Sequence, residues 1–258
     1  MRIARVSHIV FAVTMICVGI LGLIKGYYAV VWQPIPKSVP ALVYVCSVVS
    51  LISGIGLLWR RTAAVAARVL LACLLLWLLL LRLPGVFVSP TVDFWWAACK
   101  TAVMAAAAWV VYAGFATEWD RKRLGFATGD KGLRVARVLY GLALIPFGLA
   151  HFIYLQNTVS LVPGWLPWHS FWAYFTGWAF IAAGVAVIIG VCARLAAALS
   201  AAEIGGFTLL VWVPIMIAPG LRSTFQWSET VLSVALTAGA WVVADSYRGV
   251  PWLAVNKG

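Results

Sequence analysis

The chain has 258 residues, of which 64% are hydrophobic and 10% are charged, and its mean hydropathy is +1.01. An ordinary soluble domain has about 25% charged residues, so this composition excludes a typical soluble enzyme and indicates that lipid surrounds most of the chain. The net charge of +12 does not indicate nucleic-acid binding, because the basic residues lie between hydrophobic runs and not on one soluble face.

Eight segments are apolar and long enough to cross a bilayer, which takes about 20 helical residues. In chain order they are residues 6–31, 39–59, 63–88, 94–117, 134–156, 169–190, 193–218 and 227–247. The first resembles a signal peptide, but its apolar run is too long and no A-x-A site follows, so we expect it to be retained. The sequence therefore predicts an all-α polytopic membrane protein with about eight transmembrane helices.

The distribution of Lys and Arg predicts the orientation. With a cytoplasmic N-terminus, the cytoplasmic loops carry most basic residues, including the cluster from Arg121 to Arg137, whereas the outer loops carry only Lys37 and Arg222. Cytoplasmic loops are enriched in Lys and Arg. We therefore expect a multi-pass protein of the cytoplasmic (inner) membrane, surrounded by membrane lipids, with both termini in the cytoplasm.

The two halves of the chain share several short patterns in the same order. Gly22-x-x-Lys25-x-x-Tyr28 matches Gly148-x-x-His151-x-x-Tyr154, Leu83-Pro84 matches Val213-Pro214, and Trp109-Val110-Val111 matches Trp241-Val242-Val243. We interpret this as two parallel four-helix repeats, with a first unit at 1–117, a cytoplasmic linker at 118–133 and a second unit at 134–258.

The second half resembles the DoxX family of four-helix membrane proteins. The stretch from Arg137 to Phe152, the glycines Gly177 and Gly184, and the turn Cys192-Ala193-Arg194 carry the resemblance. The first half is similar more loosely, through Gly54, Gly56, Arg60 and Arg61 among others. The resemblance implies a tandem duplication of a DoxX-like unit.

The resemblance implies that the protein is a redox-associated, quinone-linked membrane subunit. Its candidate ligand is a quinone, and we expect a redox partner subunit to supply the electrons. The five cysteines form no C-x-x-C pair and no metal motif, so we expect no metal and no covalently bound cofactor. Two alternatives stay open, a non-catalytic accessory or assembly protein and a transporter or binder of a small hydrophobic molecule. Whether the chain is an enzyme is left open as well.

Glu203 and His151 are the candidate catalytic residues. Glu203 lies nine residues after Arg194 in the seventh segment, near mid-bilayer, where an ionisable side chain needs a partner or a cavity. It suits proton exchange or a hydrogen bond to a quinone carbonyl, although polar contact between helices is the simpler alternative. His151 could give a proton to a reduced ligand, or bond to a backbone carbonyl.

Six further residues are candidates for ligand binding, because they are polar or aromatic and lie toward the outer side. They are Lys25, Arg82, Lys100, Tyr154, His169 and Trp212. Charges in lipid must face each other or water, so we expect Lys100 or Arg82, with Trp212, to border a cavity shared by Glu203 and His151 and open toward the outer leaflet.

Overall fold

The computed structural model describes residues 5–255, and no named strand occurs in that range. Seven of its helices are long and apolar enough to cross a membrane, and an eighth apolar helix, Leu42–Leu58, is shorter. The prediction of an all-α polytopic membrane protein is thereby confirmed.

The first half contains four long helices with short elements between them. They are α1 (Val6–Ile24), the 3-10 turn η1 (Gly26–Tyr28), α2 (Leu42–Leu58), α3 (Ala63–Trp77), the π-helical turn η2 (Leu78–Arg82), α4 (Leu83–Val88) and α5 (Val92–Phe115). Pro84 is the second residue of α4 and has no backbone N–H to donate. The wide π-helical turn ends at Arg82, two residues before this proline.

The second half repeats this order. It consists of α7 (Gly129–Ile153), α8 (Leu155–Leu161), α9 (His169–Ile189), α10 (Ala193–Phe207), the π-helical turn η4 (Thr208–Trp212), α11 (Val213–Ile217) and α12 (Thr224–Asp245). Helix α6 (Glu118–Arg123) and the 3-10 turn η3 (Gly125–Ala127) link the halves. The predicted linker is therefore partly helical, and α7 begins inside it.

The helix bounds give the spacing between the halves. Helix α3, η2 and α4 begin at Ala63, Leu78 and Leu83, and their counterparts begin 130 residues later at Ala193, Thr208 and Val213. This common order agrees with an internal duplication, which itself stays a prediction.

The structure corrects one detail of the predicted alignment. A Cβ on Gly19 would lie 2.6 Å from the backbone nitrogen of Leu51, and a Cβ on Gly148 would meet the equivalent backbone of α9, 3.2 Å from the nitrogen of Ile181. Gly148 is therefore equivalent to Gly19, whereas the sequence comparison aligned it with Gly22. His151 lies three residues after Gly148, so its equivalent in the first half is Gly22. The predicted pairing of His151 with Lys25 was thus wrong by about one helical turn.

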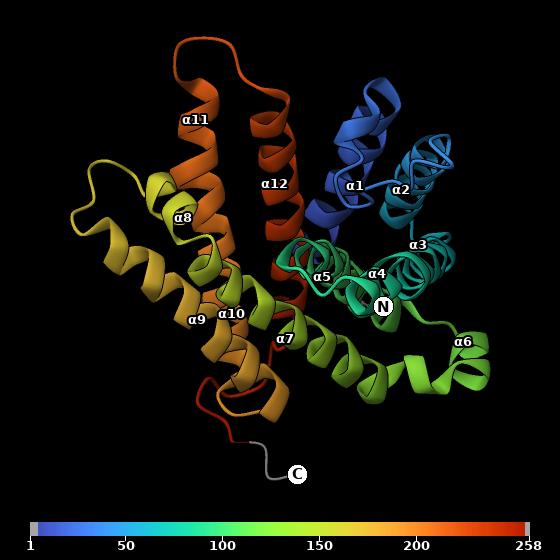
Figure 1. Cartoon of the computed structure of the whole chain (residues 1–258). Coiled ribbons are helices and arrows are strands. Elements are labelled where there is room, and N and C mark those ends of the chain that lie inside the picture. The colour runs from blue at the N-terminus through green and yellow to red at the C-terminus, as the bar shows by residue number, and fades with distance from the viewer. Residues whose placement is uncertain (1–4, 256–258) are drawn as a thin grey trace.

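Helix α5 lies at the centre of the molecule, beside α12 (Figure 1). Every α5 residue from Thr101 to Tyr112 is buried. A Cβ on Gly239 of α12 would lie 3.3 Å from Met104 Sδ and 3.5 Å from Ala107 Cβ. Small side chains at this contact let the two backbones approach closely, and this seam joins the halves.

Glycines on the second helix of each half also lie at tight contacts. A Cβ on Gly54 would lie 2.7 Å from the carbonyl oxygen of Ala12, and one on Gly184 would lie 2.6 Å from that of Gly141. These glycines therefore permit the first and second helices of each half to approach closely.

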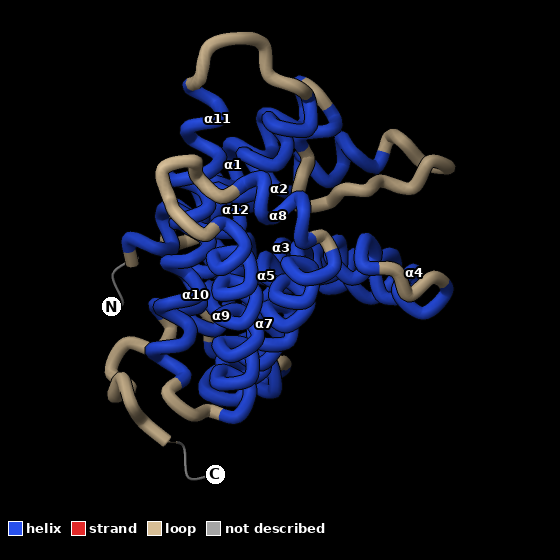
Figure 2. The backbone as a smooth tube through the Cα atoms, turned by 60° about the vertical axis from the view of Figure 1, so that its left-hand side comes forward, coloured by secondary structure: helices blue, strands red, loops and turns tan. Residues whose placement is uncertain are grey.

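One end of the bundle is held together by arginines, and we call it the basic end. Arg5 pairs with the carboxylate of Asp245 at 3.6 Å, Arg137 donates to Ser246, and Arg194 donates to the carbonyl of Val250 at 2.7 Å. The starts of α1, α7 and α10 are thus tied to the end of α12. The loop that joins α11 to α12 lies at the other end of α12, at the top of Figure 2.

The first predicted span, residues 6–31, differs most from the structure. The first apolar run was expected to continue to Val31, but α1 ends at Ile24. Residues 29–32 instead fold back into the bundle, where each is at most 5% exposed. Burial by neighbouring helices makes such a loop as apolar as a helix, so hydropathy alone cannot separate the two.

The orientation can be tested by labelling. Phe126 in η3 is 68% exposed and Leu221, between α11 and α12, is fully exposed. In a variant without the five native cysteines, we expect Phe126→Cys to react with an impermeant maleimide only after permeabilisation and Leu221→Cys to react in intact cells. The opposite pattern would reverse the orientation. Thr128 is buried and would be a poor reporter.

Asp120 in α6 accepts four hydrogen bonds at the basic end. Thr117 donates through its backbone nitrogen and hydroxyl, Tyr112 through its hydroxyl at 2.9 Å, and Arg68 through its guanidinium at 2.9 Å. Burial by itself raises the pKa of Asp120, but these hydrogen bonds and the charge of Arg68 outweigh it, so the pKa lies below its usual range.

This lowered pKa has a consequence for stability. An unfolded Asp has a pKa of about 3.9, so the stabilisation is complete above that pH and is lost as pH falls through the folded-state value. We expect Asp120→Asn to lower the free energy of unfolding by about 2 kcal/mol at neutral pH and to weaken the loss of stability in acid. Thermal unfolding in detergent between about pH 3 and 7 measures both. An equally steep acid loss in the variant would contradict this account.

Candidate functional site

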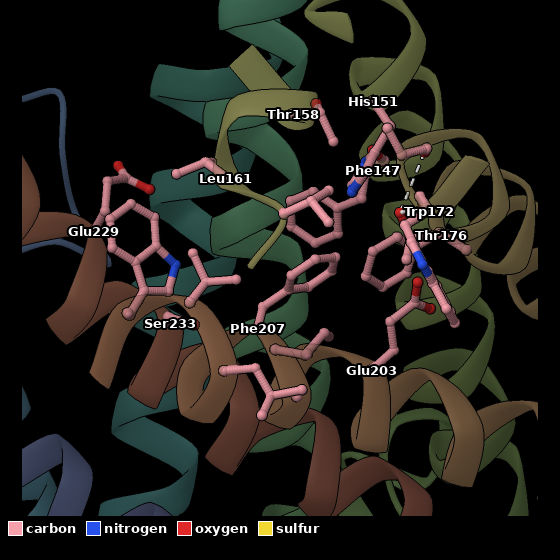
Figure 3. A pocket seen from close by; sticks show the side chains of 18 of the residues that line it. Phe147, His151, Thr158, Leu161, Trp172, Thr176, Glu203, Phe207, Glu229 and Ser233 are labelled. Atoms are coloured by element: carbon pink, nitrogen blue, oxygen red, sulfur yellow. Dashed lines mark hydrogen bonds between the residues drawn. The ribbon is translucent and has the colours of Figure 1, made fainter. Parts of the chain in front are cut away.

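A cavity of about 470 Å³ lies in the second half of the chain. Its walls come from α7, α9, α10, η4 and α12, and from Trp96 and Lys100 of α5. Pockets that bind small molecules have about this volume. We call it the second-half cavity, and Figure 3 shows the side chains that line it.

Aromatic rings form one wall of this cavity. The imidazole of His151 lies 5.5 Å from the ring of Phe180 and 5.7 Å from that of Phe207, and these two phenyl rings are stacked at 6.2 Å. Phe147 extends the wall, 6.2 Å from Phe180. Flat apolar surfaces of this kind favour a flat, apolar ligand.

His151 has a defined hydrogen-bonding state. Its Nδ1 lies 2.8 Å from the backbone carbonyl oxygen of Phe147. A carbonyl oxygen only accepts, so Nδ1 carries the proton and donates. In the neutral imidazole Nε2 then keeps its lone pair, which can accept a proton or a hydrogen bond.

Glu203 lines the same cavity from α10. It precedes Phe207 by four residues, which places both side chains on one helix face. Its Oε1 atom is buried and has no hydrogen-bond partner among the described residues. A buried polar atom without a partner is costly, so this oxygen is available to a ligand or to water.

Trp96 and Lys100 bring the first half into the cavity. The indole Nε1 of Trp96 is a second buried polar atom without a partner among the described residues. Lys100 lies 3.5 Å from Glu229 Oε1 and 5.3 Å from the centre of the Trp96 ring. Figure 3 shows Glu229 and Glu203 at opposite sides of the cavity, with Phe207 between them.

The cavity extends to the end of the bundle opposite the basic end. Pro163, Trp165 and Leu166, from the loop before α9, contribute to its lining, whereas Arg194 at the basic end follows the other end of α9. The cavity therefore reaches the side that we expect, from the loop charges, to be the outer one.

The structure distributes the sequence-based candidates unevenly. Four of them, Glu203, His151, Lys100 and Trp212, line the second-half cavity. Lys25 is exposed, and His169 begins α9 without lining the cavity. Tyr154 donates to Asp93 Oδ1 at 2.8 Å, and this hydrogen bond raises the pKa of Tyr154.

Among the described residues, no three His, Cys, Asp or Glu side chains gather as a metal site.

The corresponding space in the first half is filled by the chain itself. Trp32 is 1% exposed, its Nε1 donates to Ser50 Oγ at 2.9 Å, and its ring lies 5.4 Å from Trp77. At the spacing of the two halves, Ser50 and Trp77 correspond to Phe180 and Phe207. The Trp32 side chain thus fills the space in the first half that is equivalent to the second-half cavity.

Arg82 belongs to this filled space. It is 5% exposed and donates to the backbone carbonyls of Trp32 and of Pro34, the latter at 2.9 Å. Its counterpart is Trp212, which lines the cavity. The structure therefore places Arg82 as an anchor of the buried loop and not beside Glu203.

Several lining residues were not predicted from the sequence. Phe207, Phe180 and Thr176 look like ordinary apolar or small helix residues, and Trp96 looks like an interfacial tryptophan. The signal that could have found Phe207 is its spacing of four residues from Glu203. Nothing in the sequence could identify Trp96, because it comes from the other half of the chain.

The fold and the site together define a class, that of polytopic helical membrane proteins with a ligand-sized cavity of mainly apolar lining and a few polar groups. The DoxX family model matches residues 132–213. This segment runs from α7 to the start of α11 and includes His151, Glu203, Phe207 and Trp212. The chain is therefore DoxX-like over this segment, as predicted. No curated protein and no solved structure matches the chain.

The contrast between the halves predicts unequal effects of truncation. Trp32→Ala would leave a new void in a closed core and should cost about 3–5 kcal/mol of stability. Phe207→Ala only enlarges an existing cavity and should cost less than half of that. Thermal unfolding of both variants in the same detergent makes the comparison. Equal losses would show that the space around Trp32 is not closed.

Proposed function

We propose that this DoxX-like membrane protein binds a quinone head group in the second-half cavity and acts as a quinone-linked subunit of a redox system. The observation that carries the proposal is the pairing of unpartnered polar atoms with aromatic walls in one cavity. Glu203 Oε1 and Trp96 Nε1 are buried without partners among the described residues, and the rings of His151, Phe180 and Phe207 lie beside them.

The chemistry of a quinone complements these groups. A quinone is flat, so its ring fits between the aromatic side chains, and its two carbonyl oxygens are acceptors. The Trp96 indole N–H can donate to one of them. Reduction to the quinol adds two electrons and two protons, and Glu203 and His151 are positioned to exchange these protons.

His151 suits this role because its Nδ1–H bond to Phe147 leaves Nε2 free to exchange a proton. Lys100 and Glu229 neutralise each other at the opposite side, which keeps that side polar without a net charge. The electrons come from a redox partner subunit, in keeping with the function that the resemblance implied. From the loop charges, we expect this system to lie in the cytoplasmic membrane with both termini in the cytoplasm.

Binding can be tested directly. Quinone extracted from the purified protein is quantified by mass spectrometry, and the delipidated protein is titrated with a ubiquinone that has a decyl tail. We expect about one quinone per chain, and about fivefold weaker binding for Trp96→Phe, which loses one hydrogen-bond donor but keeps an aromatic ring. Absence of quinone from both measurements would favour the accessory-protein alternative.

Proton exchange has its own test. Glu203→Gln keeps size and hydrogen bonding but cannot exchange a proton, so quinone-linked turnover in native membranes should be abolished while decyl-ubiquinone binding persists. Glu118→Gln, an exposed carboxyl outside the spans, is the matched control and should remain fully active. If Glu203→Gln bound quinone and turned over normally, Glu203 would not be the group that exchanges protons with the quinone, and the proposed role of Glu203 would be wrong.

A further inference from the structure

A second hollow lies at the basic end, between α10 and α12. It has a volume of about 410 Å³, and we call it the basic-end groove. Its lining consists of Arg194, Ala198, Ala201, Ala202, Thr237, Trp241, Ala244, Asp245, Arg248 and Trp252. None of these residues lines the second-half cavity.

A polar contact between helices separates the two sites. The hydroxyl of Thr208 lies 2.7 Å from that of Ser233 and 2.8 Å from that of Thr237. Ser233 lines the second-half cavity and Thr237 lines the basic-end groove. The basic-end groove is therefore separate from the second-half cavity.

The groove carries more positive than negative charge. Asp245 is its one carboxylate among the described residues. It already accepts a hydrogen bond from Ser7 and forms ion pairs with Arg5 and Arg248. Arg194 has no carboxylate within ion-pair distance among the described residues, and donates only to the Val250 carbonyl. Two positive charges, net, remain among Arg5, Arg194, Arg248 and Asp245.

The first half shows how the same end of a four-helix unit can be neutralised. There Arg68, near the start of α3, lies over the Trp119 ring at 4.8 Å and pairs with Asp120 at 2.9 Å. Arg194, near the start of α10, lies over the Trp252 ring at 4.0 Å without a carboxylate. Arg194 is not at the position of Arg68, which corresponds to Ala198 at the spacing of the two halves. At this end, however, the second half also has an arginine over an aromatic ring, and that arginine lacks a carboxylate partner among the described residues.

The shape of the groove indicates which kind of anionic ligand would fit it. On α10, Arg194, Ala198 and Ala201 follow one another at helical spacing along a single face. The small side chains of the two alanines leave a channel that runs from the charged end toward Thr237, beside the exposed ring of Trp241. A channel with charge at the membrane boundary and apolar walls below it matches a phospholipid.

We propose that the basic-end groove binds an anionic phospholipid, with the phosphate headgroup at Arg194 and Arg248 and an acyl chain along the alanines of α10. Basic pockets between transmembrane helices at the membrane boundary are suited to anionic headgroups, and each basic residue there is worth about 1 kcal/mol, or about fivefold in affinity. The proposal is independent of what the second-half cavity binds.

The test uses the full-length protein in detergent and native mass spectrometry. Phosphatidylglycerol and phosphatidylcholine with identical chains are titrated separately, and inorganic phosphate is titrated as a third arm. We expect phosphatidylglycerol to bind most tightly, with about fivefold loss for Arg194→Gln and for Arg248→Gln. Arg61→Gln removes an exposed charge on the turn before α3, outside the groove, and should have no effect.

Two further variants separate lipid binding from folding and from diffuse charge. Arg194→Lys keeps the charge and should retain phosphatidylglycerol, and Ala201→Phe fills the channel and should exclude the lipid while every arginine remains. The proposal is wrong if phosphatidylcholine binds equally well, if Arg61→Gln weakens binding as much as Arg194→Gln, or if Ala201→Phe binds normally. Binding of free phosphate as tight as that of the lipid would also overturn it.

Discussion

The close contact between α5 and α12 is the constraint on which the rest of the structure depends. An added Cβ on Gly239 would already touch Met104 and Ala107, and α5 is buried on all sides from Thr101 to Tyr112. Because this seam fixes α5 against the second half, Trp96 and Lys100 reach the second-half cavity. That cavity is consequently a property of the whole chain, since neither half supplies all of its walls.

The same four-helix scaffold has two different interiors. In the first half, Gly22, Ser50 and Cys73 are small, and the space beside them is filled by Trp32, with Arg82 holding the loop. In the second half, His151, Phe180 and Glu203 stand at those positions and the loop before α9 stays at the rim. One half thus completes its core with its own chain, and the other keeps a lined cavity. Unpaired polar groups are costly in lipid, and this difference between the halves is the reason why the proposed ligand site is in the second half.

The sequence predicted the membrane class and the helices well, because hydropathy measures what lipid selects. It also identified Glu203, since a carboxyl between apolar residues is conspicuous. It failed where burial disguises a segment, as for residues 29–32, whose apolar run was interpreted as helix. It also failed where two motifs were equally similar, since Gly148 could be aligned with Gly22 or Gly19 and only the backbone contact with α9 decides. Trp96 was beyond reach, because its partners lie in the other half.

The bond between Arg5 and Asp245 has a consequence for biosynthesis. The two residues are 240 positions apart, and Asp245 is the last acidic side chain in the sequence. The ribosome therefore delivers α1 to the bilayer long before its carboxylate partner exists, while α1 and α2 can already pack through Gly19 and Leu51. We therefore expect local helix pairs to form first and the basic end to close last. A chain that stops before α12 would leave Arg5 and Ser7 without their carboxylate partner, and this end of the bundle would stay open until the last helix is inserted.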